Sequence, residues 1–396
     1  MNRLIVVGAG PAGLTLALQL ARAGLAVTLV EARRDFSRGF RGDALMPCGL
    51  ESLARMGLWS LLEELPQRPL TGWSVWIEGR QLFRVAEPMG ALQPCRLVPQ
   101  SALLEALLAQ ALRLPGFQWL PGLAVRGLLS RDPDARITGV VLADGQQLTA
   151  DLVIGCDGRD SSLRRLACLP LQHRGPALEL LWFQQQLGLD LKLGLEPNEF
   201  QTLVAGGAIA SACRNASGAL QLGWLLRPGR PEPQRSAREW VTAFAALAPP
   251  TLADALRRGA VPLNQPERFR VQVGLAPQWH RPGLLLLGDA AHPMSPIRAQ
   301  GINMALRDSL VAARQLLAAT TSSDLDQACA RIEALRRPEI ARLQALQLAE
   351  ARQGHWIGHN GWLRQGLART APLSGGLARA VWRARQGPLR EGTVWL

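Results

Sequence analysis

The sequence predicts an α/β fold in which a parallel sheet of alternating strands and helices is combined with a second, mostly antiparallel sheet. One observation is the order of strand, glycine turn, helix and strand at the start of the chain. Another is a pair of later apolar runs, 152–155 and 283–287, each leading into a short polar turn, as buried parallel strands do. The third is a hydrophobic period of two, typical of antiparallel strands with one buried face, at 72–77, 178–187 and 219–225.

The length and the composition are those of a globular protein. A chain of 396 residues is long enough for two or three packed units, and 48% hydrophobic with 19% charged residues is an ordinary balance. The first apolar run, 4–7, is too short for a secretory signal, and no window approaches the length of a membrane span. These features predict a cytoplasmic protein.

The charge and the cysteines of the chain argue against two kinds of site. The formal net charge of +13 comes almost entirely from arginine, since Lys192 is the only lysine. The arginines are dispersed and lack the interleaved aromatic residues of a nucleic-acid groove, so no nucleic-acid partner is predicted. A basic surface favours anionic small molecules instead. The six cysteines are scattered without a C-x-x-C pair, which predicts reduced, mostly buried thiols and no metal site.

The N-terminal segment has the pattern of a dinucleotide-binding unit. Gly8 permits a tight turn, Gly10 allows the backbone to approach a pyrophosphate, and Gly13 allows the helix and the strand to pack closely. The helix that follows directs its free N–H groups and its dipole towards the phosphates. The strand, turn, helix and second strand are predicted at 4–7, 8–13, 14–23 and 26–30.

An acidic residue closes the second strand of this unit. Glu31 lies 23 residues after Gly8, where a carboxylate can accept hydrogen bonds from ribose hydroxyls. A glycine turn alone is weak evidence, but the flanking strands, the helix and the acid together disfavour a purely structural turn. The predicted contacts with the dinucleotide in this segment are Gly8, Gly10, Pro11, Ala12, Gly13, Glu31, Ala32 and Arg33.

Two distant motifs accompany the glycine turn. The segment 155–158 (Gly-Cys-Asp-Gly) ends one predicted strand, and the segment 288–293 (Gly-Asp-Ala-Ala-His-Pro) follows a strand of four leucines. With the three motifs in this order, the chain resembles the FAD-dependent aromatic hydroxylases, the group typified by 4-hydroxybenzoate hydroxylase and salicylate hydroxylase. The resemblance extends from the N-terminus to about residue 350. It implies that the dinucleotide is FAD and that a Rossmann-like domain holds it.

The resemblance also assigns roles to residues of these motifs. Asp289 ends a buried strand at the carboxyl edge of the sheet, and the corresponding acid of the family holds a hydroxyl of the FAD ribityl chain. The segment 300–303 opens a helix whose positive end would face the flavin and stabilise its anionic reduced form. Taken alone, 288–293 is also consistent with a turn in which the aspartate caps a helix. The implied FAD contacts are Asp157, Gly158, Gly288, Asp289, Pro296, Gln300, Gly301, Ile302 and Asn303.

Two further polar residues match positions of the family. The segment 41–45 (Arg-Gly-Asp-Ala-Leu) matches one in which the arginine corresponding to Arg41 contacts the pyrophosphate and can meet the nicotinamide cofactor. A solvated loop arginine is the alternative. Gln100 precedes the predicted helix 101–111 and matches a position held by arginine or glutamine, so its amide is expected to contact FAD. A helix-capping or surface glutamine is the competing interpretation.

The chain departs from the family in the loop before the helix at 300–303. This loop is usually rich in glycine, but here it reads Pro-Ile-Arg-Ala at 296–299. Arg298 therefore adds a cation close to the expected position of the reduced flavin. Three roles stay open: tuning the flavin, binding an anionic substrate, or pairing with a surface carboxylate.

The resemblance implies a discontinuous domain organisation. The predicted FAD-binding domain comprises residues 1–70, 96–170 and 271–350. The predicted substrate-binding sheet, which covers the flavin, comprises residues 71–95 and 171–270. Residues 351–396 form a predicted helical C-terminal segment.

Side chains on the predicted second sheet are candidates for a substrate pocket. Trp73, Trp76, Trp182 and Trp224 fall on its strands, although a tryptophan on a strand is more often part of the core. The glutamines at 184–186 alternate between the two faces of the sheet. Their side chains are therefore expected to point either into the pocket or into solvent.

The C-terminal segment is rich in arginine and tryptophan. From residue 352 onwards it contains seven arginines and one acid. We predict a helix packed on the FAD-binding domain. A weak peripheral contact with a membrane is the alternative.

The family resemblance implies that the reaction is the hydroxylation of an aromatic or polycyclic, quinone-like small molecule. NADPH or NADH reduces FAD, O2 adds to the reduced flavin, and a flavin hydroperoxide transfers one oxygen atom to the substrate. Several hydroxylases of the group deprotonate their substrate with tyrosines, which this chain lacks entirely. Another base is then required, such as His292 or His173, or no deprotonation takes place. Because a structural role fits His292 equally well, no catalytic residue is assigned.

Two other functions are consistent with the sequence. A FAD-dependent reductase of the same fold would act on a double bond, and a flavin-binding protein without turnover would need no substrate. A flavin halogenase is disfavoured, because the W-x-W-x-I-P segment is absent and Lys192 lacks the halogenase context. The sequence predicts no oligomeric state.

Overall fold

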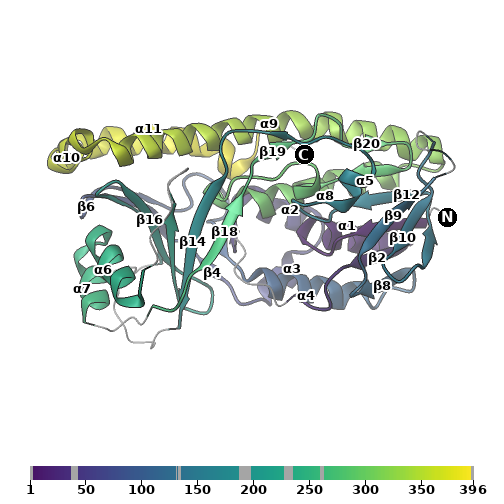
Figure 1. Cartoon of the computed structure of the whole chain (residues 1–396), viewed down its shortest axis with the longest axis horizontal. Coiled ribbons are helices and arrows are strands. Elements are labelled where there is room, and N and C mark those ends of the chain that lie inside the picture. The colour runs from purple at the N-terminus through teal and green to yellow at the C-terminus, as the bar shows by residue number, and fades with distance from the viewer. Residues whose placement is uncertain are drawn as a thin grey trace.

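A computed structural model of the chain describes residues 3–36, 43–130, 132, 135–186, 198–226, 235–258 and 263–393. Two large sheets lie towards opposite ends of the long axis, and a layer of C-terminal helices runs past both (Figure 1). One sheet is parallel except at its edge and the other is mostly antiparallel, which confirms the predicted α/β fold. Among the described residues, no helix combines the length and the apolar character of a membrane span.

The first sheet has six strands: β1 (Arg3–Val7), β2 (Ala26–Glu31), β8 (Phe117–Pro121), β12 (Leu152–Gly155), β20 (His280–Arg281) and β21 (Leu284–Leu286). Their order across the sheet is β20-β21-β12-β1-β2-β8. All neighbouring strands are parallel except β20, which joins β21 antiparallel at one edge. Because β1, β12 and β21 are buried along their length, they are continuous apolar runs rather than alternating ones.

Three helices cover one face of this sheet: α1 (Pro11–Arg22), α4 (Gln100–Ala111) and α8 (Gln300–Leu317). Proline at the first position of α1 costs no hydrogen bond, because that N–H has no partner within the helix. Leucine and alanine side chains of the three helices form one buried core with the sheet. Shorter helices nearby are α2 (Pro47–Arg55), α3 (Trp59–Glu63) and α5 (Ser162–Leu166).

The second sheet has seven strands: β5 (Gly72–Ile77), β6 (Arg80–Ala86), β14 (Leu178–Gln185), β15 (Glu199–Ala205), β16 (Ala208–Arg214), β17 (Leu220–Leu225) and β18 (Glu267–Val271). Their order is β18-β14-β17-β16-β15-β5-β6, and only β15 and β5 pair in parallel. Two helices, α6 (Ala237–Leu247) and α7 (Pro250–Arg257), cover one face. An aromatic cluster seals this contact, in which the Phe183 and Phe244 rings meet edge to face at 5.2 Å.

Three small sheets connect the larger units. The first contains β9 (Val125–Leu129), β10 (Gly139–Leu142) and β11 (Gln147–Thr149). The second contains β3 (Ala44–Leu45), β4 (Arg68–Pro69) and β7 (Arg96–Leu97). The third contains β13 (Gln172–His173) and β19 (Gly274–Leu275). Two short 3₁₀ turns, η1 (Gly288–Ala290) and η2 (Ile297–Ala299), follow β21 and precede α8.

The C-terminal layer consists of α9 (Ser322–His359), α10 (Gly361–Arg369) and α11 (Ala371–Glu391). A capping box between Thr321 and Asp324 begins α9, which passes residue 351 without interruption. The sequence predicted packing of the C-terminal helix on the FAD-binding domain. Instead, α11 lies chiefly along β6 of the second sheet, because Trp382 packs against Phe83 there, at 5.7 Å between ring centroids. The exact domain boundaries remain a prediction.

Candidate active site

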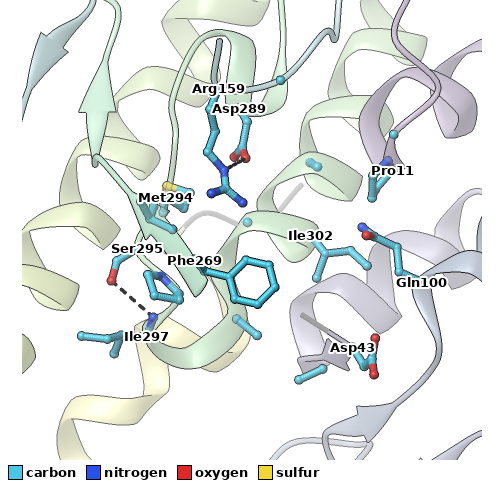
Figure 2. Close-up of a pocket in the computed structure, with 18 of the residues that line it drawn as sticks. Pro11, Asp43, Gln100, Arg159, Phe269, Asp289, Met294, Ser295, Ile297 and Ile302 are labelled. Atoms are coloured by element: carbon cyan, nitrogen blue, oxygen red, sulfur yellow. Dashed lines mark hydrogen bonds and ion pairs between the residues drawn. The ribbon is translucent and has the colours of Figure 1, made fainter. Parts of the chain in front are cut away.

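A cavity of about 800 Å³ lies between the two large sheets. One wall is the carboxyl edge of the first sheet, where β1, β2, β12 and β21 end, together with the first turn of α8 (Figure 2). The other wall is one face of the second sheet. Ligands of open parallel sheets bind at the carboxyl edge, so the cavity stands where the glycine turn predicts a cofactor.

Most of the predicted cofactor residues line this cavity, although they come from six separate segments of the chain. The lining residues among them are Gly8, Gly10, Pro11, Ala12, Glu31, Ala32, Gln100, Asp157, Gly158, Gly288, Asp289, Pro296, Gly301 and Ile302. Arg41 lies outside the described residues.

Four predicted contacts do not line the cavity. Gly13 packs inside the turn, and Arg33 is exposed, with its backbone N–H bound to Glu31. Gln300 donates from Nε2 to the carbonyls of Arg298 and Leu389. Asn303 accepts from the Met46 N–H at 2.8 Å and donates to the carbonyls of Ala44 and Ala299. The sequence predicted that Gln300 and Asn303 contact FAD. In the structure, their side-chain amides instead bind backbone groups and hold the loop before α8 in place.

The glycine turn leaves room for a ligand at one position only. A Cβ on Gly8 would lie 2.4 Å from the Cys156 carbonyl oxygen, and a Cβ on Gly13 would lie 1.9 Å from the Gly8 carbonyl oxygen. A Cβ on Gly10 would meet no atom within 4 Å. Gly10 is also the N-cap of α1 and has no side chain to bind the free N–H groups of the first turn. The turn therefore offers an open cradle of N–H donors that fits a pyrophosphate.

Glu31 braces the same turn. Its Oε2 accepts a hydrogen bond from the Ala9 N–H at 2.7 Å, and its Oε1 accepts one from the Arg33 N–H at 3.0 Å. The carboxylate is buried, and a carboxylate oxygen can accept more than one hydrogen bond. This geometry is compatible with the predicted ribose contact and adds a structural role that the spacing alone did not indicate.

Asp157 caps a helix. Its carboxylate accepts hydrogen bonds from the hydroxyl of Ser161 and from the backbone N–H groups of Ser162 and Leu163 at the start of α5. The negative charge is well placed at this positive helix end. The carboxylate thus holds the turn after β12, while the adjacent Gly158, with φ of +84°, lines the cavity.

Asp289 pairs with an arginine that sequence reasoning missed. The Arg159 Nε lies 3.3 Å from Asp289 Oδ2, and both side chains are about one-third exposed (Figure 2). Because Asp289 stands in η1 directly after β21, its carboxylate is at the carboxyl edge of the sheet, as predicted. Arg159 could have been predicted as a site residue from its position directly after the Asp-Gly motif.

Arg298 forms an ion pair with a carboxylate, which is one of the three roles that the sequence left open. Its Nε lies 2.9 Å from Glu350 on α9. The guanidinium also contacts the rings of Trp73 and Trp382, at 5.1 and 4.8 Å from their centroids. Arg298 and Ala299 both have positive φ, a backbone conformation that residues with a side chain rarely adopt. The contacts of the Arg298 side chain therefore stabilise this turn.

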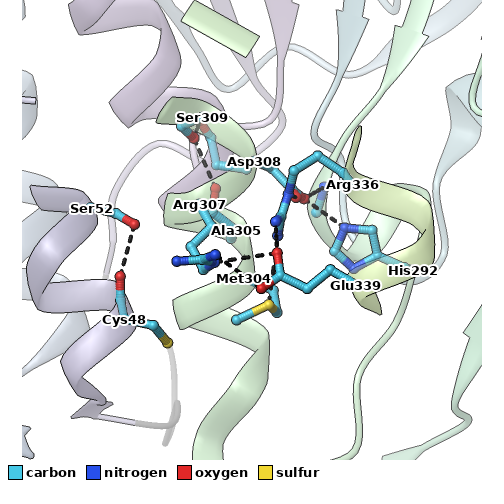
Figure 3. Close-up of polar contacts among 12 residues, drawn as sticks. Cys48, Ser52, His292, Met304, Ala305, Arg307, Asp308, Ser309, Arg336 and Glu339 are labelled. Atoms are coloured by element: carbon cyan, nitrogen blue, oxygen red, sulfur yellow. Dashed lines mark hydrogen bonds and ion pairs between the residues drawn. The ribbon is translucent and has the colours of Figure 1, made fainter. Parts of the chain in front are cut away.

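Neither candidate histidine is placed as a base. His292 is buried outside the cavity lining, with Nε2 2.6 Å from Asp308 (Figure 3). His173 is exposed on β13 and does not line the cavity. The structural interpretation of His292 is therefore the correct one. Its partner Asp308 also binds Arg336 at 2.7 Å within a buried network of charges.

Burial and ion pairing act in opposite directions on Asp308. Burial alone would raise the pKa of the Asp308 carboxyl, but the charges of His292 and Arg336 and their hydrogen bonds outweigh it and hold the pKa at about 2. Glu339 binds Arg336 and Arg307 in the same network. The network joins α8 to α9 behind the cavity.

The face of the second sheet that lines the cavity is apolar and aromatic. On β14, β15 and β18 the lining residues are two positions apart, because the pleat directs alternate residues to one face, whereas β16 and β17 contribute the consecutive residues 209–211 and 223–225. Of the four candidate tryptophans, Trp73, Trp182 and Trp224 line the cavity, whereas Trp76 packs towards α6 and does not. The glutamines at 184–186 do not line it either. The lining residues of the sheet strands include Leu180, Phe200, Thr202, Ile209, Ser211, Cys213, Gln221, Phe269 and Val271.

Asp43 is a second residue that sequence reasoning missed. It precedes β3, lines the cavity, and accepts a hydrogen bond from Gln221 Nε2 at 3.3 Å. Burial raises the pKa of the Asp43 carboxyl to about 6, and hydrogen bonds from Gln221 and the Gln100 backbone offset part of this effect. The only indication of this residue in the sequence was its position, as a single carboxylate directly before the apolar segment 44–48.

Comparisons with known proteins agree with this site. Residues 2–343 match the family described as "FAD binding domain". The chain is 34% identical over 358 residues to a 6-methylpretetramide 4-monooxygenase of Streptomyces rimosus, covering 88% of this chain and 83% of that protein. It is 29% identical to the ubiquinone hydroxylase UbiL of Rhodospirillum rubrum, covering 87% and 79%.

The fold has a counterpart among solved structures. PqsL of P. aeruginosa, in complex with 2-aminobenzoylacetate, superposes with a TM-score of 0.78 at 22% identity, covering 93% of this chain and 98% of that one. That likeness concerns the fold alone. The family match over most of the length and the identity to the S. rimosus enzyme go further: this chain belongs to the FAD-dependent aromatic monooxygenases.

Proposed function

We propose that this enzyme hydroxylates a polycyclic aromatic compound, held between bound FAD and the second sheet, at the expense of NADPH or NADH and O2. The observation that carries the proposal is the single cavity that runs from the glycine turn to the aromatic face of that sheet. The S. rimosus relative is named for a polycyclic substrate, 6-methylpretetramide. A planar, fused ring system matches a wall of this composition.

The first wall supplies the proposed FAD site. The open N-terminus of α1 at Gly10 would bind the pyrophosphate, and Glu31 and Asp289 would accept hydrogen bonds from ribose and ribityl hydroxyls. Gly301 and Ile302 of the first turn of α8 line the cavity, where the positive end of this helix would stabilise developing negative charge. When bound, FAD supplies the redox chemistry, so these residues only position it and adjust its electrostatics.

The second wall supplies the proposed substrate site. The rings of Trp182, Phe200 and Phe269 offer flat apolar surfaces for an aromatic substrate. Polar groups on this wall are few, among them Thr202 and Ser211, which can orient a substrate through single hydrogen bonds. An apolar wall also keeps water from the reacting atoms.

The nicotinamide cofactor has no binding unit of its own in this proposal. The sequence contains one glycine-turn unit, and the chain carries a formal net charge of +13. An anionic NADPH or NADH is then attracted to the surface and meets the flavin transiently. Substrate binding is expected to favour that arrangement in proportion to its differential affinity.

The test combines a screen with two matched variants. Phenolic polycyclic compounds that accelerate NAD(P)H oxidation by the FAD-loaded enzyme are identified, and their products are analysed by mass for one added oxygen atom from labelled O2. Trp182→Leu is expected to raise KM about tenfold through lost ring contact. Trp76→Leu, which alters a strand residue outside the cavity, is the control with unchanged KM. Acceleration with hydrogen peroxide as the only product, or loss of a double bond without added oxygen, would reject the proposed hydroxylation.

A further inference from the structure

Hydroxylation of a phenolic ring is easier when the hydroxyl has lost its proton, because the negative charge on oxygen activates the ring carbon. A phenol has a pKa of about 10, so a base is needed near neutral pH. The chain contains no tyrosine, and both candidate histidines lie outside the cavity lining. The base must therefore be sought among the carboxylates of the cavity.

Most of these carboxylates are engaged elsewhere. Asp157 caps α5, Asp289 pairs with Arg159, and Glu350 pairs with Arg298. Glu31 is held by backbone N–H groups at the glycine turn, on the cofactor side. Asp160 is exposed.

Asp43 differs in its position and in its partners. Its backbone carbonyl accepts a hydrogen bond from the Val98 N–H at 2.8 Å, which fixes the residue at the start of β3. Its carboxylate Oδ2 faces Gln221 Nε2 at 3.3 Å, on the substrate-side sheet. Gln221 Oε1 in turn lies 3.7 Å from the Cys213 thiol. All three side chains line the cavity, and Figure 2 shows Asp43 on the same side as Gln100 and Ile302.

The orientation of the Gln221 amide follows from this chain of contacts. The thiol of Cys213 is the donor to Oε1, so the NH2 group must point at Asp43. One carboxylate oxygen is then occupied by a neutral donor, while the carboxylate keeps further lone pairs for a ligand. No arginine is paired with it among the described residues.

We propose that Asp43 is the catalytic base that accepts the proton of the substrate hydroxyl, with Gln221 as its positioning residue. The assignment rests on the proposed function. The O–H bond of the substrate breaks, its proton moves to Asp43, and the electron pair on oxygen activates a ring carbon. That carbon bonds to one atom of O2, while NADPH or NADH supplies the two electrons that reduce the other atom to water. The hydrogen displaced from the carbon leaves as a proton, and Asp43 releases its own proton to solvent.

The surroundings of Asp43 suit this role. Burial raises its pKa to about 6, which makes it a stronger base than an ordinary aspartate yet leaves it ionised at pH 7. The facing thiol of Cys213 does not compete for protons, because burial and the charge of Asp43 raise its pKa to about 12. The cations on neighbouring elements are engaged: Arg298 of η2 with Glu350, and Arg96 of β7 with Gln67 and Gln93.

The experiment compares Asp43→Asn with Asp144→Asn, which changes an exposed carboxylate outside the cavity lining. Asp43→Asn is expected to bind FAD normally and to lose about 10²–10⁴-fold in kcat for hydroxylation. Its pH profile should lack the limb that rises near pH 6 in the wild type. Asp43→Glu should restore part of the rate, and the bound substrate should show phenolate absorbance only when a carboxylate is present at position 43. Asp144→Asn should behave as the wild type.

A second variant covers the case in which Asp43→Asn does not fold. Gln221→Met removes the neutral donor and is expected to shift the rising limb to higher pH, because the ionised carboxylate loses a hydrogen bond. A wild-type rate and pH profile in Asp43→Asn, or an unmoved limb in Gln221→Met, overturns the assignment. If the wild type itself hydroxylates no phenolic compound, the proposed function fails instead.

A separate observation concerns the surface of the C-terminal helices. On α11, Leu373, Leu377 and Val381 stand at intervals of four residues and are 88, 72 and 42% exposed. Trp362 of α10 is 93% exposed. The opposite side of α11 is already packed against β6, so this outward row of apolar side chains is not needed for folding.

The exposed charges on α10 and the main part of α11 are of one sign. Arg369, Arg379 and Arg383 are exposed and form no ion pair among the described residues, and Glu391 is the only acid in α10 and α11. Of the two interpretations of the C-terminal segment, we propose that this face, the α10–α11 face, binds the surface of an anionic lipid bilayer. The apolar side chains would enter the headgroup boundary while the arginines meet lipid phosphates.

Vesicle flotation tests this second proposal. The enzyme is expected to float with vesicles of equimolar phosphatidylglycerol and phosphatidylcholine but not with phosphatidylcholine alone, and added salt should weaken the binding. The double variant Trp362→Ser, Leu377→Ser should lose binding, and each arginine removed should weaken it about fivefold. Leu92→Ser, at a 99% exposed leucine elsewhere, is the control. Absent vesicle binding, or a dimer that only the double variant dissociates, would overturn the proposal, and the dimer would assign the face to a second copy of the chain.

Discussion

The Arg159 guanidinium lies 3.3 Å from the Asp289 carboxylate, so the turns after β12 and β21 meet at the carboxyl edge of the first sheet. A carboxylate in this position can exchange its partly exposed arginine partner for a hydroxyl of the cofactor. Ion pairs that solvent reaches contribute little to stability, so the pair itself does not explain an acid here.

Asp289→Ala is expected to weaken FAD binding by about 1.5–3 kcal/mol, roughly 10- to 150-fold in Kd, because a charge-assisted hydrogen bond is lost. Fluorescence titration of the apoprotein with FAD measures the change. Asp144→Ala, at an exposed carboxylate outside the cavity lining, should leave Kd unaltered. Equal affinities of Asp289→Ala and the wild type would remove Asp289 from the site.

Gly10→Ala and Gly13→Ala should separate cofactor binding from folding. The Cβ of Gly10→Ala meets nothing within 4 Å, so the stability of the apoprotein should change by less than about 0.5 kcal/mol while FAD binding falls at least about tenfold. The Cβ of Gly13→Ala would lie 1.9 Å from a backbone oxygen and should cost about 1–3 kcal/mol of stability. Urea unfolding and FAD titration of both apoproteins measure the two effects. Tight FAD binding by Gly10→Ala would refute the proposed pyrophosphate cradle.

Asp308 should make the protein sensitive to acid. Its folded pKa, about 2, lies below the ordinary value of 3.8, so its contribution to stability is complete above about pH 4 and is lost as the pH falls towards 2. Asp308→Asn should lower the free energy of unfolding at pH 7 by about 3–5 kcal/mol, since the buried Arg336 loses one of its two carboxylate partners and keeps only Glu339. It should also flatten the decline in stability between pH 4 and 2. Asp144→Asn, at an exposed turn, is the control for urea unfolding across this range.

The thiols should divide into two classes. Five cysteines are buried and free, and burial raises the pKa of Cys48 to about 11 and of Cys329 to about 12, which suppresses the reactive thiolate. Cys168 is exposed. A thiol reagent at pH 8 should therefore modify one cysteine of the folded protein and all six in denaturant. Cys168→Ser should abolish the fast reaction, and a fast reaction that persists in this variant would contradict the burial of the other five.

Local patterns in the sequence determined the fold class and most of the cofactor side of the site. The glycine turn, the acid at the end of β2 and the two later motifs are short segments whose conformation follows from residue type. Parallel strands bring their carboxyl ends together, so residues such as Gly10, Glu31 and Asp289 converge without further information. The free, mostly buried thiols were predicted from composition and are confirmed.

The tertiary structure alone decided which polar groups are free. Gln300 and Asn303 looked like cofactor contacts in the sequence, but their amides satisfy backbone groups of distant segments. His292 was a candidate base until its buried contact with Asp308 appeared. Asp43 and Gln221 are 178 residues apart, and no local pattern can indicate that their side chains meet. A hydrogen bond and a pKa depend on partners and burial that are set by long-range packing, whereas a glycine turn depends on its own backbone.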